Sequence, residues 1–206
     1  MRERLHGLYV IIDPEVAGGR DELEIARQAI EGGARLIQLR DKRREKGWQL
    51  PVALALARLC REAGLLFIVN DHLDLALAAE ADGVHLGQKY LPVEVVRRLA
   101  PRDFIVGCSA NNVAEAVRAE GAGADYVSVG RLFPTGSKED TRPATTDTIR
   151  AVKAEVRVPV CAIGGINEEN IDEVIAAGAD MAAVIAAVVA ASDPREAARR
   201  LAGRFS

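Results

Sequence analysis

The chain repeats one pattern, in which a short apolar run is followed by a longer stretch with helical spacing of apolar residues. The apolar runs are nearly continuous rather than alternating with polar residues, which favours parallel strands covered on both faces. The longer stretches are amphipathic: Leu23, Ala26 and Ile30, for example, fall on one helical face. The predicted strands are 7–13, 35–39, 66–70, 83–86, 104–108, 125–129, 158–163 and 180–185, and the clearest predicted helices are 21–31, 47–63, 112–120 and 168–177.

Small residues mark the junctions between helices and strands, at Gly33-Ala34, Ala81-Asp82-Gly83, Gly123-Ala124-Asp125 and Gly178-Ala179-Asp180. A glycine there supplies the left-handed residue that ends a helix. Eight strands alternating with helices in 206 residues match a minimal (β/α)8 barrel, the TIM barrel. An open doubly wound sheet is the alternative, but no Gly-x-Gly-x-x-Gly follows the first strand. We therefore predict an α/β protein in which residues 1–206 form a single (β/α)8 barrel domain.

The composition narrows the class of protein. Hydrophobic residues make up 49% of the chain, and 27 basic against 30 acidic residues give a net charge of −3. This balance provides no basic surplus for nucleic acid. The longest apolar run, 181–191, is too short to span a bilayer, and the first residues lack a secretory signal pattern. Three cysteines without a Cys-x-x-Cys pair indicate buried, reduced thiols. We expect a cytoplasmic protein that binds small molecules, with no nucleic-acid or membrane partner, and the composition is compatible with a homo-oligomer.

Polar residues at the ends of the strands are the first candidates for chemistry, because active sites of such barrels lie there. The second strand leads into Gln38, Arg40 and Lys42, which strand alternation places on one side. Two cations converging there suit a phosphate or diphosphate. The alternative is a solvated loop that continues into Arg43 and Arg44.

The third strand ends in Asn70-Asp71. A carboxylate at a barrel mouth near cations has three open interpretations: a metal ligand, a base, or a partner in a salt bridge. Magnesium favours oxygen ligands and commonly keeps water and substrate phosphates in its shell. The residues alone do not decide between the salt bridge and the metal.

Two later segments are candidates for anion binding. Thr135-Gly136-Ser137-Lys138 combines hydroxyls, flexible backbone and a cation, although it lacks Walker spacing. Gly164-Gly165 ends the seventh strand before a helix predicted to begin near Asn167, where phosphate is commonly bound. The alternatives are a polar turn and a tight turn without a ligand. The three histidines form no cluster with the spacing of a catalytic triad or a zinc site.

Taken together, these segments resemble the blocks of the thiamine-phosphate synthase family, whose superfamily also contains a thiazole tautomerase. The resemblance implies a barrel enzyme, a transferase of thiamine biosynthesis. Such an enzyme joins hydroxymethylpyrimidine diphosphate to a thiazole phosphate and releases thiamine monophosphate and diphosphate. The matching blocks occur in the family's order and are Gln38-Leu-Arg-Asp-Lys42, Val69-Asn-Asp-His-Leu-Asp-Leu-Ala76, Ala81-Asp-Gly-Val-His-Leu-Gly-Gln88, Phe133-Pro-Thr-Gly-Ser-Lys138 and Ala162-Ile-Gly-Gly-Ile166.

The resemblance also implies roles for single residues. Asp71 would bind Mg²⁺, the implied cofactor. The implied mechanism is dissociative: diphosphate leaves first, and the thiazole nitrogen then attacks the pyrimidine-methyl cation. Arg40, Lys42, Ser109 and Lys138 would act as catalytic residues on the departing diphosphate. The implied ligands of the pyrimidine diphosphate are Gln38, Arg40, Lys42, Asn70, Ser109 and Lys138, and those of the thiazole phosphate are Thr135, Ser137, Gly165, Ile185 and Ala186.

The chain departs from the family pattern at several positions. Tyr90 stands where the family has a second magnesium-binding Asp, and Ala186 stands where a Ser is common. The family's Gly-Pro-x-Phe is here 130–133, Gly-Arg-Leu-Phe. Asn111 replaces a common His, which is catalytic in the tautomerase branch. An active synthase is the favoured interpretation. A tautomerase-like isomerase is disfavoured by Asn111, and a non-catalytic or substrate-altered relative that binds thiamine precursors is favoured by Tyr90 and Ala186.

Overall fold

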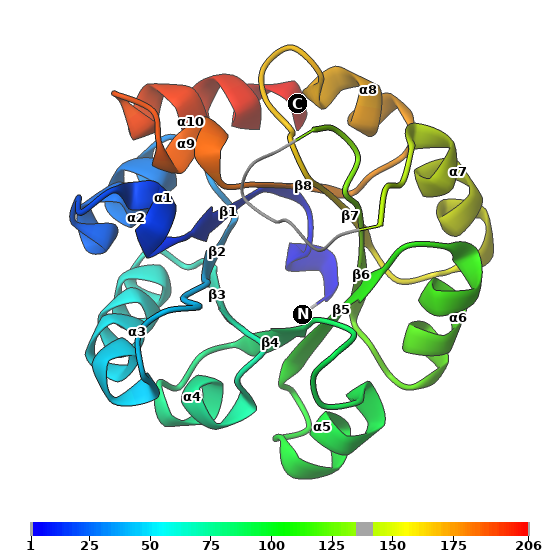
Figure 1. The fold of residues 1–206 in the computed structure, drawn as a ribbon, viewed down its shortest axis with the longest axis horizontal. Helices are drawn as coiled ribbons and strands as arrows, with labels where there is room; N and C mark the ends of the chain where they lie inside the picture. The colour runs from blue at the N-terminus through cyan, green and yellow to red at the C-terminus, as the bar shows by residue number, and fades with distance from the viewer. Residues whose placement is uncertain (1, 135–141, 206) are drawn as a thin grey trace.

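The computed structural model describes residues 2–134 and 142–205. Eight parallel strands pair in chain order, and β8 pairs back with β1 to close a barrel (Figure 1). The closed sheet confirms the predicted (β/α)8 barrel and excludes the open doubly wound sheet. The strands are β1 (Gly7–Ile12), β2 (Leu36–Leu39), β3 (Leu66–Asn70), β4 (Gly83–Leu86), β5 (Ile105–Ala110), β6 (Tyr126–Val129), β7 (Val160–Ile163) and β8 (Met181–Val184).

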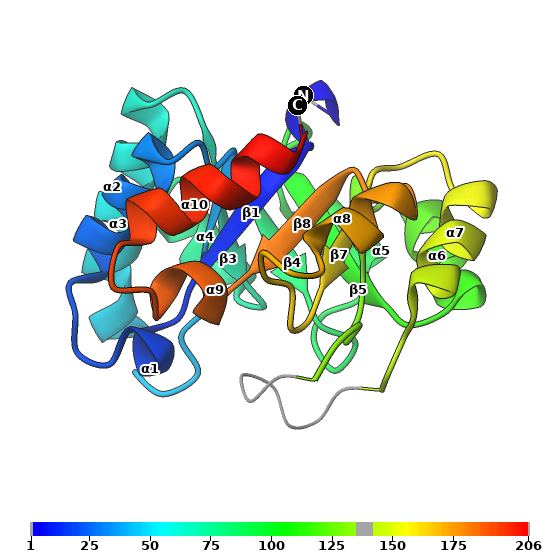
Figure 2. The ribbon, with the colours of Figure 1, turned by 90° about the horizontal axis from the view of Figure 1, so that it is seen from above.

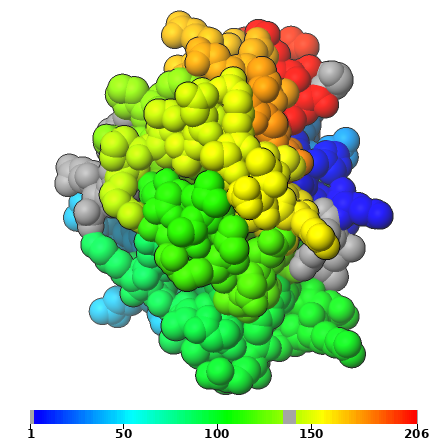
Figure 3. All heavy atoms as spheres, turned by 90° about the vertical axis from the view of Figure 1, so that its right-hand side faces the viewer, coloured from blue at the N-terminus to red at the C-terminus, as the bar shows by residue number. Residues whose placement is uncertain are grey.

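Helices surround the barrel and cover the outer face of the strands (Figure 1). Figure 3 shows the side chains of α5 to α8 forming one continuous surface over this part of the barrel. The α-helices are α1 (Pro14–Ala17), α2 (Glu22–Glu31), α3 (Lys46–Glu62), α4 (Leu73–Ala78), α5 (Val93–Leu99), α6 (Val113–Gly121), α7 (Thr146–Glu155), α8 (Ile171–Ala176), α9 (Ala186–Val189) and α10 (Pro194–Ala202), with short 3-10 turns η1 (Arg2–Arg4) and η2 (Gly203–Phe205) near the ends.

The predicted start of the helix after β7 is wrong. Helix α8 begins at Ile171, and residues 168–170 form a turn. The side-chain oxygen of Asn170 accepts from the backbone N–H of Asn167 at 2.9 Å, and the Asn167 side chain accepts from Glu169 N–H at 2.9 Å. Asparagine side chains that bond nearby backbone groups compete with helix formation, which explains the later start.

Strand alternation sends one set of side chains outward against the helices and the other into the lumen. The lumen is filled by large side chains, among them Tyr9 and Tyr126, and Leu5 packs into the same cluster from the N-terminal segment. Figure 2 shows η1 at the end of the barrel where the strands begin, opposite α1 and α9. The lumen is therefore a packed core, and ligands have access to it from the ends of the strands.

The helix-to-strand junctions follow the predicted glycine pattern at three of four places. Gly33, Gly123 and Gly178 have φ of 100°, 99° and 95°, in the left-handed region that favours glycine. At the fourth junction the left-handed residue is Glu80, with φ of 52°. Gly83 instead lies within β4, where a Cβ would collide with the carbonyl of Ile105. That glycine is needed for space and not for a turn.

The strands end on the side of the barrel that carries α1 and α9, opposite the chain termini (Figure 2). Polar groups at this mouth form the candidate site. The expectation of buried thiols holds for Cys60 and Cys161, whereas Cys108 is partly exposed, and none of the three cysteines forms a disulfide. Across residues 2–134 and 142–205, no helix is both long enough and apolar enough to span a membrane.

Candidate functional site

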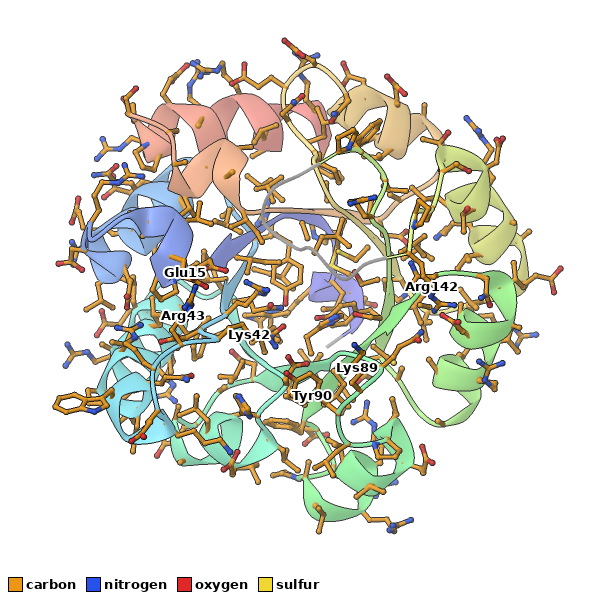
Figure 4. The ribbon with its side chains drawn as sticks, in the orientation of Figure 1. Glu15, Lys42, Arg43, Lys89, Tyr90 and Arg142 are labelled. Atoms are coloured by element: carbon orange, nitrogen blue, oxygen red, sulfur yellow. The ribbon has the colours of Figure 1, made fainter. Side chains whose placement is uncertain are left out.

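Gln38, Arg40 and Lys42 lie on the lumen side of β2 and of the segment that follows it, as the alternation predicts. Gln38 is buried within the lumen, and Arg40, one step further along, is partly buried. Lys42 is partly exposed (Figure 4). Arg43 points outward and pairs with Glu15 at 2.7 Å. The solvated-loop alternative thus describes Arg43, whereas Arg40 and Lys42 lie at the mouth above the buried Gln38.

Asp13 holds Arg40 in place. It is buried at the end of β1, where one oxygen accepts from Glu15 N–H at 3.0 Å and caps α1. The other oxygen accepts from Nη1 of Arg40. Sequence reasoning missed Asp13. The available signal was a carboxylate that ends a strand and precedes a proline, which is the pattern of a helix N-cap.

Asp71, the residue directly after β3, accepts hydrogen bonds from three groups. Lys42 Nζ and Asn70 Nδ2, the latter at 2.6 Å, donate to Oδ2, and the backbone N–H of Gly87 donates to Oδ1 at 2.8 Å. The backbone of Asp71 has φ of 62°, which is uncommon for a non-glycine residue and fixes the direction of the carboxylate. The structure shows the salt bridge that the sequence left open, and metal ligation by Asp71 stays a prediction.

Tyr90 completes the surroundings of Lys42. Its hydroxyl accepts from Lys42 Nζ at 2.9 Å, and the ammonium lies 4.7 Å from the ring centroid (Figure 4). Burial lowers the pKa of Lys42, but the hydrogen bonds to Asp71 and Tyr90 outweigh it, so the pKa lies above its ordinary value. The Lys42 side chain is therefore protonated and positively charged near neutral pH.

The side chains at the mouth can be tested for their fit to a bound Mg²⁺ ion. Within residues 2–134 and 142–205, no group of three or more His, Cys, Asp or Glu side chains could hold a metal ion. Asp71 offers one carboxylate, and Tyr90 offers a neutral phenol beside it. One anionic ligand fits Mg²⁺ when substrate phosphate and water supply most of the shell. The residues therefore fit an ion that arrives with a diphosphate better than a tightly held resident ion.

Five side chains form a hydrogen-bonded chain across the lumen beneath the mouth. Gln38 Nε2 donates to the Tyr9 hydroxyl at 2.5 Å, and that hydroxyl lies 3.2 Å from the hydroxyl of Tyr126. The Tyr126 hydroxyl lies 3.0 Å from Nδ1 of His85, whose Nε2 lies 3.0 Å from Ser109 Oγ. We call this the lumen chain. It joins two predicted ligands, Gln38 and Ser109, through three residues that sequence reasoning did not select.

Gly164 and Gly165 are in the left-handed region, with φ of 105° and 68°. A Cβ on Gly165 would lie 2.6 Å from the carbonyl oxygen of Pro134, and the N–H of Phe133 donates to the Gly164 carbonyl at 2.9 Å. The tight-turn alternative accounts for both glycines, because the segment after β6 packs directly on them. Binding of the thiazole phosphate by Gly165 stays a prediction, as it does for buried Ile185 and exposed Ala186 at the start of α9.

Asn111 ties together the backbone on either side of residues 135–141. Its Nδ2 donates to the carbonyls of Gly130 at 2.6 Å and Arg142 at 2.8 Å. The Arg142 guanidinium donates in turn to Glu115 at 2.7 Å (Figure 4). Asn111 thus has a structural role at the place where the tautomerase branch has its histidine. The predicted ligands Thr135, Ser137 and Lys138 lie outside the described residues.

Comparison with known proteins identifies the family. The family model described as thiamine monophosphate synthase matches residues 8–188. The chain belongs to this family. The thiamine-phosphate synthase of Methanocella arvoryzae is 50% identical over 197 residues, which cover 95% of this chain and 93% of the relative. That of Methanospirillum hungatei is 49% identical over 197 residues, covering 95% and 96%.

A solved structure of the family has the same fold. The thiamine phosphate pyrophosphorylase from Pyrococcus furiosus superposes with a TM-score of 0.91 at 41% identity, covering 99% of this chain and 96% of that one. These relatives are named as enzymes, and the chain is an enzyme of the thiamine monophosphate synthase family. The resemblance in the sequence blocks is thereby confirmed.

Proposed function

We propose that this enzyme is a transferase of thiamine biosynthesis that condenses hydroxymethylpyrimidine diphosphate with a thiazole phosphate. The products are thiamine monophosphate and diphosphate. The observation that carries the proposal is the arrangement at the mouth of a barrel of this family, where Asp13 holds Arg40 and Asp71 accepts from Lys42 and Asn70.

Carboxylates hold Arg40 and Lys42 at the mouth: Asp13 pairs with Arg40, and Asp71 pairs with Lys42. Because the carboxylates already hold the side chains of Arg40 and Lys42 in position, these side chains need to move little during the reaction. A diphosphate brings a higher charge than a carboxylate and competes for the N–H donors that face the mouth. Arg40 and Lys42 are therefore placed to stabilise charge on a leaving diphosphate.

In the proposed reaction the bond between the pyrimidine methylene carbon and the diphosphate oxygen breaks first, and its electron pair leaves with the diphosphate. The amino group of the pyrimidine stabilises the resulting cation, and the thiazole nitrogen attacks it with its lone pair. Arg40, Lys42, Ser109 and Lys138 act as the catalytic residues on the diphosphate, and Gln38 and Asn70 bind the same substrate. The ligands proposed for the thiazole phosphate are Thr135, Ser137, Gly165, Ile185 and Ala186.

Mg²⁺ is the cofactor that we propose, with Asp71 as its protein ligand. When bound, the ion adds positive charge at the departing diphosphate. The N–H of Gly87 and the amide of Asn70 hold the Asp71 carboxylate in a fixed direction toward the mouth. Lys42, which shares Oδ2 with Asn70, supplies a second positive charge from the protein itself.

The contacts of Asn111 support the synthase over a tautomerase-like isomerase. Its amide donates to two backbone carbonyls, and a carboxamide does not act as an acid or a base near neutral pH. The dissociative condensation requires no base at this place.

The test is incubation of the purified chain with both substrates and Mg²⁺, followed by chromatography for thiamine phosphate and an assay for diphosphate. We expect both products in equal amounts, and neither when one substrate is omitted. Arg40→Ala and Lys138→Ala should each lower kcat by about a hundredfold, the loss of about 2.7 kcal/mol of transition-state stabilisation. Arg43→Ala is the matched control, because that side chain is 76% exposed and pairs outward, and it should leave kcat unchanged. Absence of thiamine phosphate with tight substrate binding would support the non-catalytic interpretation.

A further inference from the structure

The hydrogen bonds of the lumen chain run in one direction from donor to acceptor. That direction determines whether the Ser109 hydroxyl donates to a ligand or only accepts from it. We propose that Tyr126 is a positioning residue that fixes His85 with its ring proton on Nε2, so that the hydroxyl of Ser109 donates toward the mouth. The inference rests on the proposed function only for the role of Ser109 as a ligand of the diphosphate.

The direction begins at Gln38. Its amide nitrogen faces the Tyr9 oxygen at 2.5 Å and acts only as a donor. The Tyr9 oxygen accepts, so its own single proton points to the Tyr126 oxygen, 3.2 Å away. The proton of Tyr126 is then available to the next group, Nδ1 of His85 at 3.0 Å.

Both phenols are in a state that supports this direction. Tyr9 and Tyr126 are fully buried, and burial raises the pKa of each hydroxyl above its ordinary value. Each phenol therefore keeps its proton near neutral pH. A phenol with one proton donates one hydrogen bond, which means that accepting at one end commits it to donating at the other.

At His85 the direction decides the tautomer. A ring whose Nδ1 accepts from Tyr126 carries its proton on Nε2, and Nε2–H donates to Ser109 Oγ at 3.0 Å. The Ser109 hydroxyl proton then remains for an acceptor at the mouth, such as an anionic oxygen. In the opposite direction Ser109 would donate to His85 and present only lone pairs to the anion.

The packing of Tyr126 keeps it in this role. Its ring stacks on the His85 ring, with centroids 5.5 Å apart and an interplanar angle of 26°, and it meets the Tyr9 ring edge-on at 6.3 Å. Gly107 on β5 makes room for the phenol, because a Cβ there would overlap its ring carbons and hydroxyl. The hydroxyl of Tyr126 therefore has a fixed place between Tyr9 and His85.

The experiment is ¹⁵N NMR of the histidine rings in the free protein, in which a protonated and an unprotonated ring nitrogen have distinct shifts. The chain has three histidines, and His85→Gln assigns the signal of interest. We expect the proton on Nε2 in the unmodified chain. Tyr126→Phe should give a mixture of tautomers and lower kcat about tenfold, the effect of about one misplaced hydrogen bond. Tyr9→Phe interrupts the chain between Gln38 and Tyr126, so Tyr126 no longer accepts and the preference for Nε2–H should weaken as well. Arg43→Ala, whose side chain pairs outward with Glu15 and lies outside the lumen chain, is the control and should leave the tautomer unchanged.

A second variant keeps the test decisive if Tyr126→Phe does not fold. Gln38→Glu replaces the donor at the start of the chain with a carboxylate, which only accepts, and should reverse the chain and move the His85 proton to Nδ1. A proton on Nδ1 in the unmodified protein would overturn the proposed direction, as would an unchanged tautomer in both Tyr126→Phe and Gln38→Glu. An unchanged kcat in folded Tyr126→Phe would overturn the positioning role. These spectra need no substrate, so a failure of the proposed synthase reaction would appear separately, as absent product with the unmodified chain.

Discussion

Removal of the charge on Asp71 tests how strongly the barrel mouth holds Lys42. The substitution Asp71→Asn keeps the size of the side chain and an oxygen that accepts from Gly87 N–H. Asparagine also tolerates the left-handed backbone at this position, where φ is 62°. The substitution therefore removes the charge and replaces Oδ2, the acceptor of Lys42 and Asn70, with an N–H donor.

The exposure of the two partners sets the expected magnitude. The Asp71 side chain is 4% exposed and that of Lys42 is 31% exposed. Fully exposed pairs contribute at most about 1 kcal/mol, and hydrogen bonds to charged groups about 1.5–3 kcal/mol. Because Lys42 regains water when its partner is removed, we expect a coupling free energy of about 1 kcal/mol, at the upper end of the first range.

The assay is urea unfolding, without metal, of the unmodified chain, Asp71→Asn, Lys42→Met and the double variant, which isolates the coupling. The pair of Arg43 and Glu15 serves as the control cycle, since these side chains are 76% and 47% exposed. Its coupling should lie near zero. If the two cycles gave the same coupling, the burial of Asp71 would have no energetic consequence and the reasoning would fail.

Three further predictions concern the mouth and the lumen. Tyr90→Asp should lower the Mg²⁺ concentration for half-maximal rate, because it adds an anionic oxygen beside Asp71, and coinciding titration curves would place Tyr90 outside the metal shell. Gly107→Ala should destabilise the fold by about 1–3 kcal/mol in urea unfolding, because the new methyl group overlaps Tyr126, and an unchanged midpoint would contradict that packing. Burial raises the pKa of Glu115, but its bonds to the backbone of Asn111 and to Arg142 outweigh this and lower the pKa from 4.5 to about 2. Its contribution to stability should thus be complete above pH 4.5 and be lost as pH falls toward 2, and the fall should be shallower in Glu115→Gln.

The sequence by itself determined the barrel architecture and the common side on which the polar residues of β2 and the following segment lie. Strands β3 and β4 have the predicted bounds, 66–70 and 83–86, because each is a short, mainly apolar run that is followed directly by polar or glycine residues. The repeated alternation of such runs with amphipathic helices led directly to the closed barrel. The period of two along a strand was sufficient to put Gln38, Arg40 and Lys42 on the same side.

The tertiary structure alone decided which partners these residues meet. Arg40 is held by Asp13 from another strand, and no local pattern links the two. The lumen chain draws Tyr9, Gln38, His85, Ser109 and Tyr126 from five strands, and no local pattern links the candidate ligands Gln38 and Ser109 to the other three residues. Local periodicity fixes the face on which a side chain lies, because neighbours in the chain share the same backbone geometry. Contacts across the lumen depend on the register and closure of the whole barrel, which sets how far each strand is shifted against the next.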